Sequence, residues 1–121
     1  MDTETEERKP RVFVIEQLPF DYRAADAFGE VYFFQTTARL APDAPTEQWN
    51  ATIIHGLRRE LAGYIAGIDW IVPTGAPERM VLVGMLLAER GERHNLLKWD
   101  ARTQRYVPYS FNLRKENGSP S

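Results

Sequence analysis

The sequence predicts a small α/β domain, with a mostly parallel sheet, helices on both faces and a hairpin at its C-terminal end. Residues 12–15 and 31–34 are wholly apolar runs, typical of strands buried on both faces. Segments with helical patterns separate the predicted strands, and such alternation is typical of a parallel sheet. Residues 105–113 alternate apolar with polar residues, which indicates a hairpin strand at a sheet edge.

Composition narrows the class of protein. The chain has 121 residues, 43% of them apolar, which fits one globular domain. We expect this domain to span residues 11–114, between a flexible charged leader at 1–10 and a flexible tail at 115–121. The chain has no Cys, and its apolar runs are too short to cross a bilayer, so we expect a cytoplasmic protein without a membrane partner. A net charge of −2 argues against binding long nucleic acids.

The N-terminal half predicts two strands and two helical segments. A strand at 11–18 ends at Pro19, and residues 20–28 can form one or two helical turns. A second strand covers 31–34, and a loop with two prolines covers 37–45. Residues 46–65 form the clearest helix, which Thr46 can cap. Its predicted buried face consists of apolar residues at helical spacing: Trp49, Ile53, Leu57, Leu61 and Tyr64.

Residues 68–90 are the stretch on which the predicted site depends. A buried strand stops at Pro73, a loop of small residues covers 74–77, and a helix covers 78–90. In open α/β sheets such a loop binds anions, because free N–H groups and the helix dipole meet there. The loop lacks the glycines of a dinucleotide site and the Gly-Lys-Ser/Thr of a P-loop, so an ordinary turn that binds nothing is an alternative.

The helix at 78–90 is apolar nearly all round, so it needs two surfaces to pack against. The sheet is one, and either a second subunit or the 46–65 helix is the other. A fourth strand follows at 96–99, then a turn at 100–104 and the edge strand at 105–113. Pro108 suits an edge position because it cannot donate a hydrogen bond to a neighbouring strand.

Chemical motifs are sparse. His55 and His94 are the only histidines and have no metal-binding spacing, so we predict no metal and no cofactor. We interpret Asp69 and Asp100 as solvated turn residues. Cations are dense between Arg90 and Arg105, which usually indicates a solvated face. The same chain could instead place positive and small residues around one crevice for a phosphorylated ligand: Thr74, Gly75, Arg79, Lys98 and Arg102.

The C-terminal half resembles the small stand-alone CARF-type (CRISPR-associated Rossmann) ring nucleases of type III CRISPR systems. The similar segments are IVPTGAP, MVLVGMLLAER, NLLKWD and RYVPYSFNL, and the DAR of residues 100–102 resembles an Asp-Pro-Arg turn in one branch. The resemblance covers about residues 50–113. It implies a Rossmann-like homodimer that binds a cyclic oligoadenylate across the dimer axis and cleaves it without metal.

The resemblance also implies roles for individual residues. Thr74, Gly75 and Ala76 match the ligand loop, while Gln17 and Phe20 line the other side of the pocket. Lys98 and Arg102 are the catalytic candidates, because they could stabilise charge on the developing phosphorane. Two alternatives remain open. One is a non-catalytic nucleotide-binding sensor or sponge, and the other is a Rossmann-like assembly protein with no ligand.

Overall fold

The computed structural model describes residues 8–35 and 41–114. The predicted tail, most of the predicted leader and part of the 37–45 loop lie outside these residues. One sheet contains strands β1 (Arg11–Val14), β2 (Glu30–Phe33), β3 (Trp70–Val72), β4 (Arg93–Asp100) and β5 (Arg105–Asn112), in the order β2-β1-β3-β4-β5. The first four strands are parallel, and β5 is antiparallel to β4. The predicted fold class is therefore confirmed.

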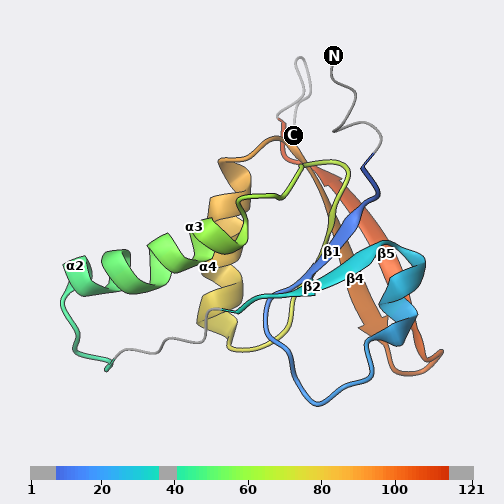
Figure 1. Ribbon diagram of the computed structural model, residues 1–121, viewed down its shortest axis with the longest axis horizontal. Helices are drawn as coiled ribbons and strands as arrows, with labels where there is room; N and C mark the ends of the chain where they lie inside the picture. The colour runs from blue at the N-terminus through green and yellow to red at the C-terminus, as the bar shows by residue number, and fades with distance from the viewer. Residues whose placement is uncertain (1–7, 36–40, 115–121) are drawn as a thin grey trace, which may run out of the picture.

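The longer helices cover one face of the sheet (Figure 1). One helical run consists of α2 (Thr46–Trp49), a π-helical turn η2 (Asn50–Ile54) and α3 (His55–Glu60), and α4 (Pro77–Ala88) lies beside it. The predicted buried face of the first helix is confirmed, since Trp49 packs against a core formed by Phe13, Ile15, Phe34, Ile53, Leu57, Leu61, Tyr64, Ile71, Val83, Leu86 and Leu87.

The opposite face carries a short 3-10 helix, η1 (Arg23–Ala27), drawn in light blue in Figure 1. The chain moves one way along the sheet from β1 to β2 and the other way from β2 to β3 and β4. Because crossovers are right-handed, this reversal moves the connecting helices to the other face. The core on the η1 side is smaller and is formed by Val12, Val14, Tyr22, Ala25, Val72, Leu97 and Tyr106.

The first helix differs from its prediction at both ends. Pro45 holds the N-cap position and makes no side-chain cap bond, so the prediction that Thr46 caps the helix is wrong. The helix ends at Glu60 rather than at residue 65. The turn that follows is stabilised from outside, because the Arg90 guanidinium donates to the carbonyl oxygens of Leu61 at 2.8 Å and of Ala62 and Tyr64 at 3.4 Å.

Asp69 corrects another prediction, because it is fully buried rather than solvated. Its carboxylate accepts hydrogen bonds from the Arg8 guanidinium at 2.7 Å, the Arg11 backbone N–H at 2.9 Å and the Ile65 backbone N–H at 2.8 Å. A buried carboxylate is stable only when such donors satisfy it. Asp69 therefore joins the start of β1 to the segment that precedes β3.

Candidate functional site

The candidate site lies where the neighbouring strands β1 and β3 end. From β1 the chain crosses to one side of the sheet and from β3 to the other side. In open α/β sheets, ligands bind at such a switch point. Thr74, which follows β3, joins the two loops. Its hydroxyl donates to the carbonyl oxygen of Glu16 at 2.6 Å and accepts from the Glu16 backbone N–H at 3.1 Å. Thr74 therefore connects the loop after β3 to the loop after β1 through two hydrogen bonds.

The start of α4 is occupied by a carboxylate of the same chain. The side chain of Glu16 accepts a hydrogen bond from the Ala76 backbone N–H at 3.3 Å. It also lies against Gly75, where any β-carbon would come within 2.6 Å of the Glu16 β-carbon. Gly75 has a φ of +103°, which a residue with a side chain rarely adopts. The predicted loop of Thr74, Gly75 and Ala76 thus exists, with Glu16 in the position that an anion would take.

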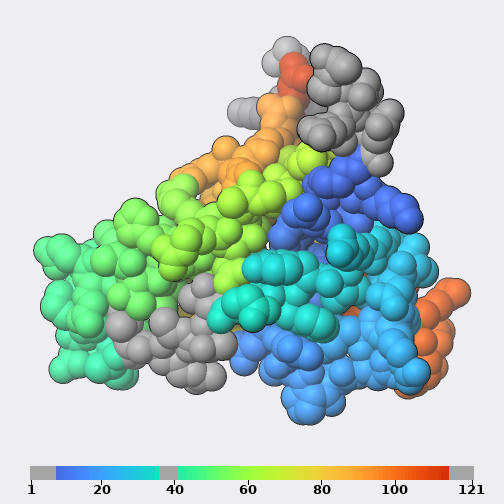
Figure 2. All heavy atoms as spheres, viewed as in Figure 1, coloured from blue at the N-terminus to red at the C-terminus, as the bar shows by residue number. Residues whose placement is uncertain are grey.

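Beside this loop, three aromatic side chains form a depression that we call the aromatic hollow: Phe20, Trp99 and Tyr106. The Trp99 and Tyr106 rings meet edge to face with centroids 5.0 Å apart, and Phe20 is 60% exposed. Two cavities, of about 480 and 250 Å³, share these three rings. The space-filling view shows the loop after β1 and η1 next to the β4–β5 turn, at the border of the larger cavity (Figure 2).

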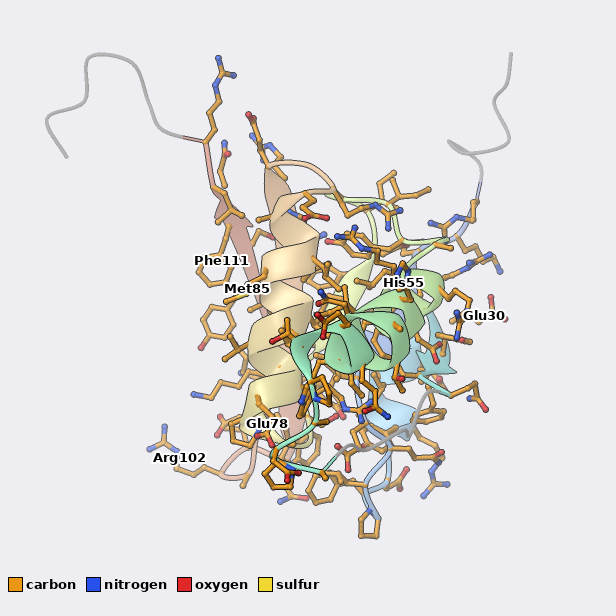
Figure 3. All side chains as sticks on the ribbon, turned by 90° about the vertical axis from the view of Figure 1, so that its left-hand side faces the viewer. Glu30, His55, Glu78, Met85, Arg102 and Phe111 are labelled. Carbon is orange, nitrogen blue, oxygen red and sulfur yellow. The ribbon has the colours of Figure 1, made fainter. Side chains whose placement is uncertain are left out.

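The predicted site residues converge only in part. Phe20, Thr74 and Lys98 line the smaller cavity. Gln17 lines a third cavity, of about 310 Å³, which also reaches Phe20. Arg79 lies in the first turn of α4, half-buried. The Arg102 side chain, on the β4–β5 turn, extends away from the molecule (Figure 3) and does not line these cavities.

Charges at the hollow are mixed. Lys98 is exposed on the smaller cavity, and Asp21 lies on the larger one. Asp21 is paired with Arg23 at 2.6 Å, and this hydrogen-bonded partner lowers the pKa of Asp21 to about 2. Burial raises the pKa of the Tyr106 phenol. The hollow therefore offers ring surfaces rather than a cluster of cations.

The two histidines differ in their surroundings. His94 is buried and stacks on Tyr64, with an interplanar angle of 11°. Its Nε2 lies 2.9 Å from the Gly91 carbonyl oxygen, and its Nδ1 lies 2.6 Å from the Tyr64 hydroxyl. His55 is exposed on α3. Residues 8–35 and 41–114 contain no group of three or more potential metal-ligating side chains.

A second surface lies on the helix side of the sheet. Val81 and Met85 of α4 are 56% and 62% exposed, and Tyr109 and Phe111 of β5 are also exposed. Figure 3 shows Met85 and Phe111 on the same side of the molecule. Strand pairing agrees, since Phe111 is opposite His94, whose ring stacks on Tyr64 of the helix-side core. We call this the α4–β5 surface: Val81, Gly84, Met85, Ala88, Tyr109 and Phe111.

Sequence reasoning missed two features of these surfaces. The sequence predicts Tyr106 only as part of the edge strand, whereas the structure places it opposite Trp99 in the hairpin register and in the aromatic hollow. The sequence pattern assigns no role to Glu16. Its place directly after the first buried strand was a signal, because that position borders the switch point. No helix in the described part of the chain has the length and apolarity needed to cross a membrane.

Comparison with known proteins finds one family. A family profile described as "Phage Pam3 gp32-like protein" matches residues 10–113. This match covers all five strands and all the helices of the described residues. No curated protein and no solved structure matches the chain.

Proposed function

Because the chain belongs to the Phage Pam3 gp32-like protein family, we propose that it is a phage assembly protein that binds further copies of itself and catalyses no reaction. The observation that carries this proposal is the α4–β5 surface. A contiguous patch of large apolar side chains on a protein surface usually marks a site where a partner binds. Here α4 and the edge strand β5 each contribute two such side chains to one face, Val81 and Met85, and Tyr109 and Phe111.

The contacts at the switch point support a protein-binding role over catalysis. Glu16 already satisfies the Ala76 N–H at the start of α4, and its negative charge opposes that of a phosphate. Arg102 extends away from the molecule and does not line the cavity that Lys98 lines. Because the chain has no Cys, it needs no oxidising compartment, which supports assembly in the cytoplasm.

The first test is the mass of the protein in solution. We expect the unmodified protein to sediment as a dimer or larger assembly at micromolar concentration. Met85→Asp should shift it to the monomer, because a carboxylate cannot be buried in an apolar contact without a partner. Phe20→Asp is the matched control, since Phe20 is as exposed as Met85 and belongs to the aromatic hollow. An unmodified protein that stays monomeric at all concentrations would overturn the proposal.

A second candidate function is cyclic oligoadenylate binding, in keeping with the resemblance to ring nucleases. The aromatic hollow favours it, because exposed rings can stack on adenine and Lys98 is among the residues that line the smaller cavity. A phosphate close to Ala76 would require Glu16 to move away. In this candidate, homodimers form a pocket from two copies of the hollow, and cleavage without metal depends on Lys98 and Arg102.

Direct incubation separates this candidate from the first. The protein is mixed with cyclic tri-, tetra- and hexa-adenylate, and the products are analysed by chromatography beside a thermal-shift measurement. A raised melting temperature with intact ligand, lost in Trp99→Ala, would support a sensor or sponge. Linear fragments that disappear in Lys98→Ala would support a ring nuclease. No shift and no product with any ring would leave assembly as the function.

A further inference from the structure

The exposed side of α4 has a pattern that fits a second copy of the same helix. Resting on the proposed assembly function, we propose that two chains pack their α4 helices antiparallel across a twofold axis, with Met85 of each chain over Gly84 of the other. The α4–β5 surface of one copy then packs on the same surface of the other copy.

The outward stripe of α4 alternates large with small residues. Val81, Gly84, Met85 and Ala88 are all exposed and follow one another at helical spacing. Their order is large, small, large, small, and no charged residue lies in the stripe between its ends. The buried side of the same helix is formed by Val83, Leu86 and Leu87. The helix is therefore apolar on two sides, and its own fold covers one of them.

Gly84 is the least expected residue in this stripe. It lies in the middle of a 12-residue helix, where Gly costs about 1 kcal/mol relative to Ala. A β-carbon at this position would meet no atom within 4 Å. No close contact inside the chain therefore requires Gly. A helix of another chain would require Gly at this position, because the absence of a side chain lets a side chain of that helix approach the backbone of α4 closely.

The stripe is complementary to itself in one alignment. Antiparallel packing about the midpoint between Gly84 and Met85 places each large residue on a small one: Met85 on Gly84 and Val81 on Ala88. Parallel packing in register would place Met85 on Met85 and leave a gap between two glycines. A twofold interface uses the same patch on both subunits, so the patch must fit itself. The antiparallel order meets this condition, and it also sets the helix dipoles in opposite directions.

Strand β5 contributes its face rather than its edge. The Leu113 N–H donates to the Glu92 carbonyl at 2.7 Å, so odd-numbered residues of β5 direct their backbone groups toward β4. Pro108 is even-numbered and lies on the outer edge, where it lacks a donor. Proline at this place weakens pairing with another strand. The stacked rings of Tyr109 and Phe111 can instead extend the α4 contact on the helix side.

Cysteine cross-linking tests the alignment, because the 121-residue chain has no Cys of its own. Val81→Cys protein is mixed with Ala88→Cys protein that carries a longer affinity tag, and the mixture is oxidised. Antiparallel packing brings residue 81 level with residue 88 of the partner. Two copies of residue 81, or of residue 88, are then offset by about 10 Å along the helices, beyond disulfide reach. We expect the disulfide-linked dimer of mixed size to dominate.

The other outcomes separate this inference from the proposed function. Linked dimers of equal size would overturn the antiparallel alignment. An absence of linked dimers, while Met85→Asp still abolishes assembly, would overturn the inference and leave the proposed function standing. A protein that never assembles would overturn both.

A second variant tests the contact at Gly84. Gly84→Leu has open space around its β-carbon within the chain, so it should fold, and it should weaken self-association about tenfold or more by crowding the partner's Met85. Ala51→Leu, at an exposed helical position outside the stripe, should leave association unchanged. Equal association in both variants would overturn the predicted contact.

Discussion

The Glu16 carboxylate accepts a hydrogen bond from the Ala76 backbone N–H across 60 positions of sequence, at 3.3 Å. This contact places a negative charge of the chain itself at the start of α4, where the helix dipole favours an anion. The same side chain occupies the space beside Gly75. The loop that resembles a ligand site is thus internally satisfied, and Glu16, Gly75 and Ala76 stabilise the contact between the ends of β1 and β3.

This contact predicts that substitutions at Glu16 and at Gly75 have stability effects that do not add. Glu16→Ala should reduce the free energy of unfolding by about 1 kcal/mol, the usual effect of losing a helix cap. Gly75→Ala should cost more, because its β-carbon would overlap Glu16 at a φ of +103°. In the double variant the overlap with the Glu16 carboxylate group disappears while the overlap with its β-carbon remains, so its loss should be smaller than the sum of the two single losses. Urea denaturation measures all three, with Gln17→Ala, an exposed neighbour, as the control. Additive losses would contradict the overlap.

The buried carboxylate of Asp69 predicts a larger effect. Asp69→Asn removes the charge that pairs with Arg8 at 2.7 Å and replaces one acceptor with a donor. Breaking a buried ion pair costs about 3 kcal/mol or more. Asp26→Asn, at an exposed position of η1, is the matched control and should shift the urea midpoint little. Equal urea midpoints for the two variants would mean that the hydrogen bonds of Asp69 to the start of β1 do not stabilise the fold.

Tyr32 predicts the behaviour of the protein in alkali. Its hydroxyl donates to the buried Glu60 carboxylate at 2.6 Å, and this hydrogen bond raises the pKa of Tyr32 to about 12 from the usual 10. A phenol with a raised pKa in the folded state contributes stability that is complete below pH 10 and is lost as the pH rises toward 12. Tyr32→Phe should reduce this alkaline loss, although Tyr64 and Tyr106 also have raised pKa values and keep part of it.

Urea denaturation of Tyr32→Phe at pH 7 and between pH 10 and 12 measures this effect. Tyr109→Phe serves as the control, because that phenol is exposed. A curve between pH 10 and 12 identical to that of the unmodified protein would contradict a role for the Tyr32–Glu60 bond in alkaline stability.

The helix-side core predicts a contrast between two phenylalanines. Phe13 is 2% exposed and meets Tyr32, Phe34 and Tyr64 edge to face. Phe13→Ala should therefore cost about 3–5 kcal/mol by leaving a cavity. Phe20→Ala removes the same atoms from an exposed ring and should change stability by about 0.5 kcal/mol or less. Thermal and urea unfolding distinguish them, and similar losses would mean that Phe20 is covered in solution.

The sequence predicted the order of elements because buried segments have recognisable patterns of apolar residues along the chain. The apolar runs at Val12 and Val31 became β1 and β2, and the helical repeat through Ile53 and Leu57 became a buried face. Its predictions were wrong where a distant residue changed the local outcome. Arg90 supports the turn after Glu60, so the helix ends early, and Asp69 is buried because Arg8 and the Arg11 backbone reach it.

At the candidate site, too, the sequence predicted the local features and missed the contacts between distant residues. Loop composition after Val72 predicted a turn that leads into a helix, and its glycine has the positive φ that such turns require. The residue that fills this turn is Glu16, which no local pattern connects to Gly75. Lys98 and Arg102 are four positions apart in sequence, yet Arg102 lies on the hairpin turn and does not line the cavity that Lys98 lines.

By itself, the sequence determined that this protein has a parallel sheet with an antiparallel edge and that α4 is apolar on more than one side. These properties follow from side-chain periodicity, which is local. Only the tertiary structure decided which side of α4 is left exposed and which carboxylate occupies the start of that helix. Both depend on how the sheet and α3 pack against α4, and packing joins residues that are far apart in the chain.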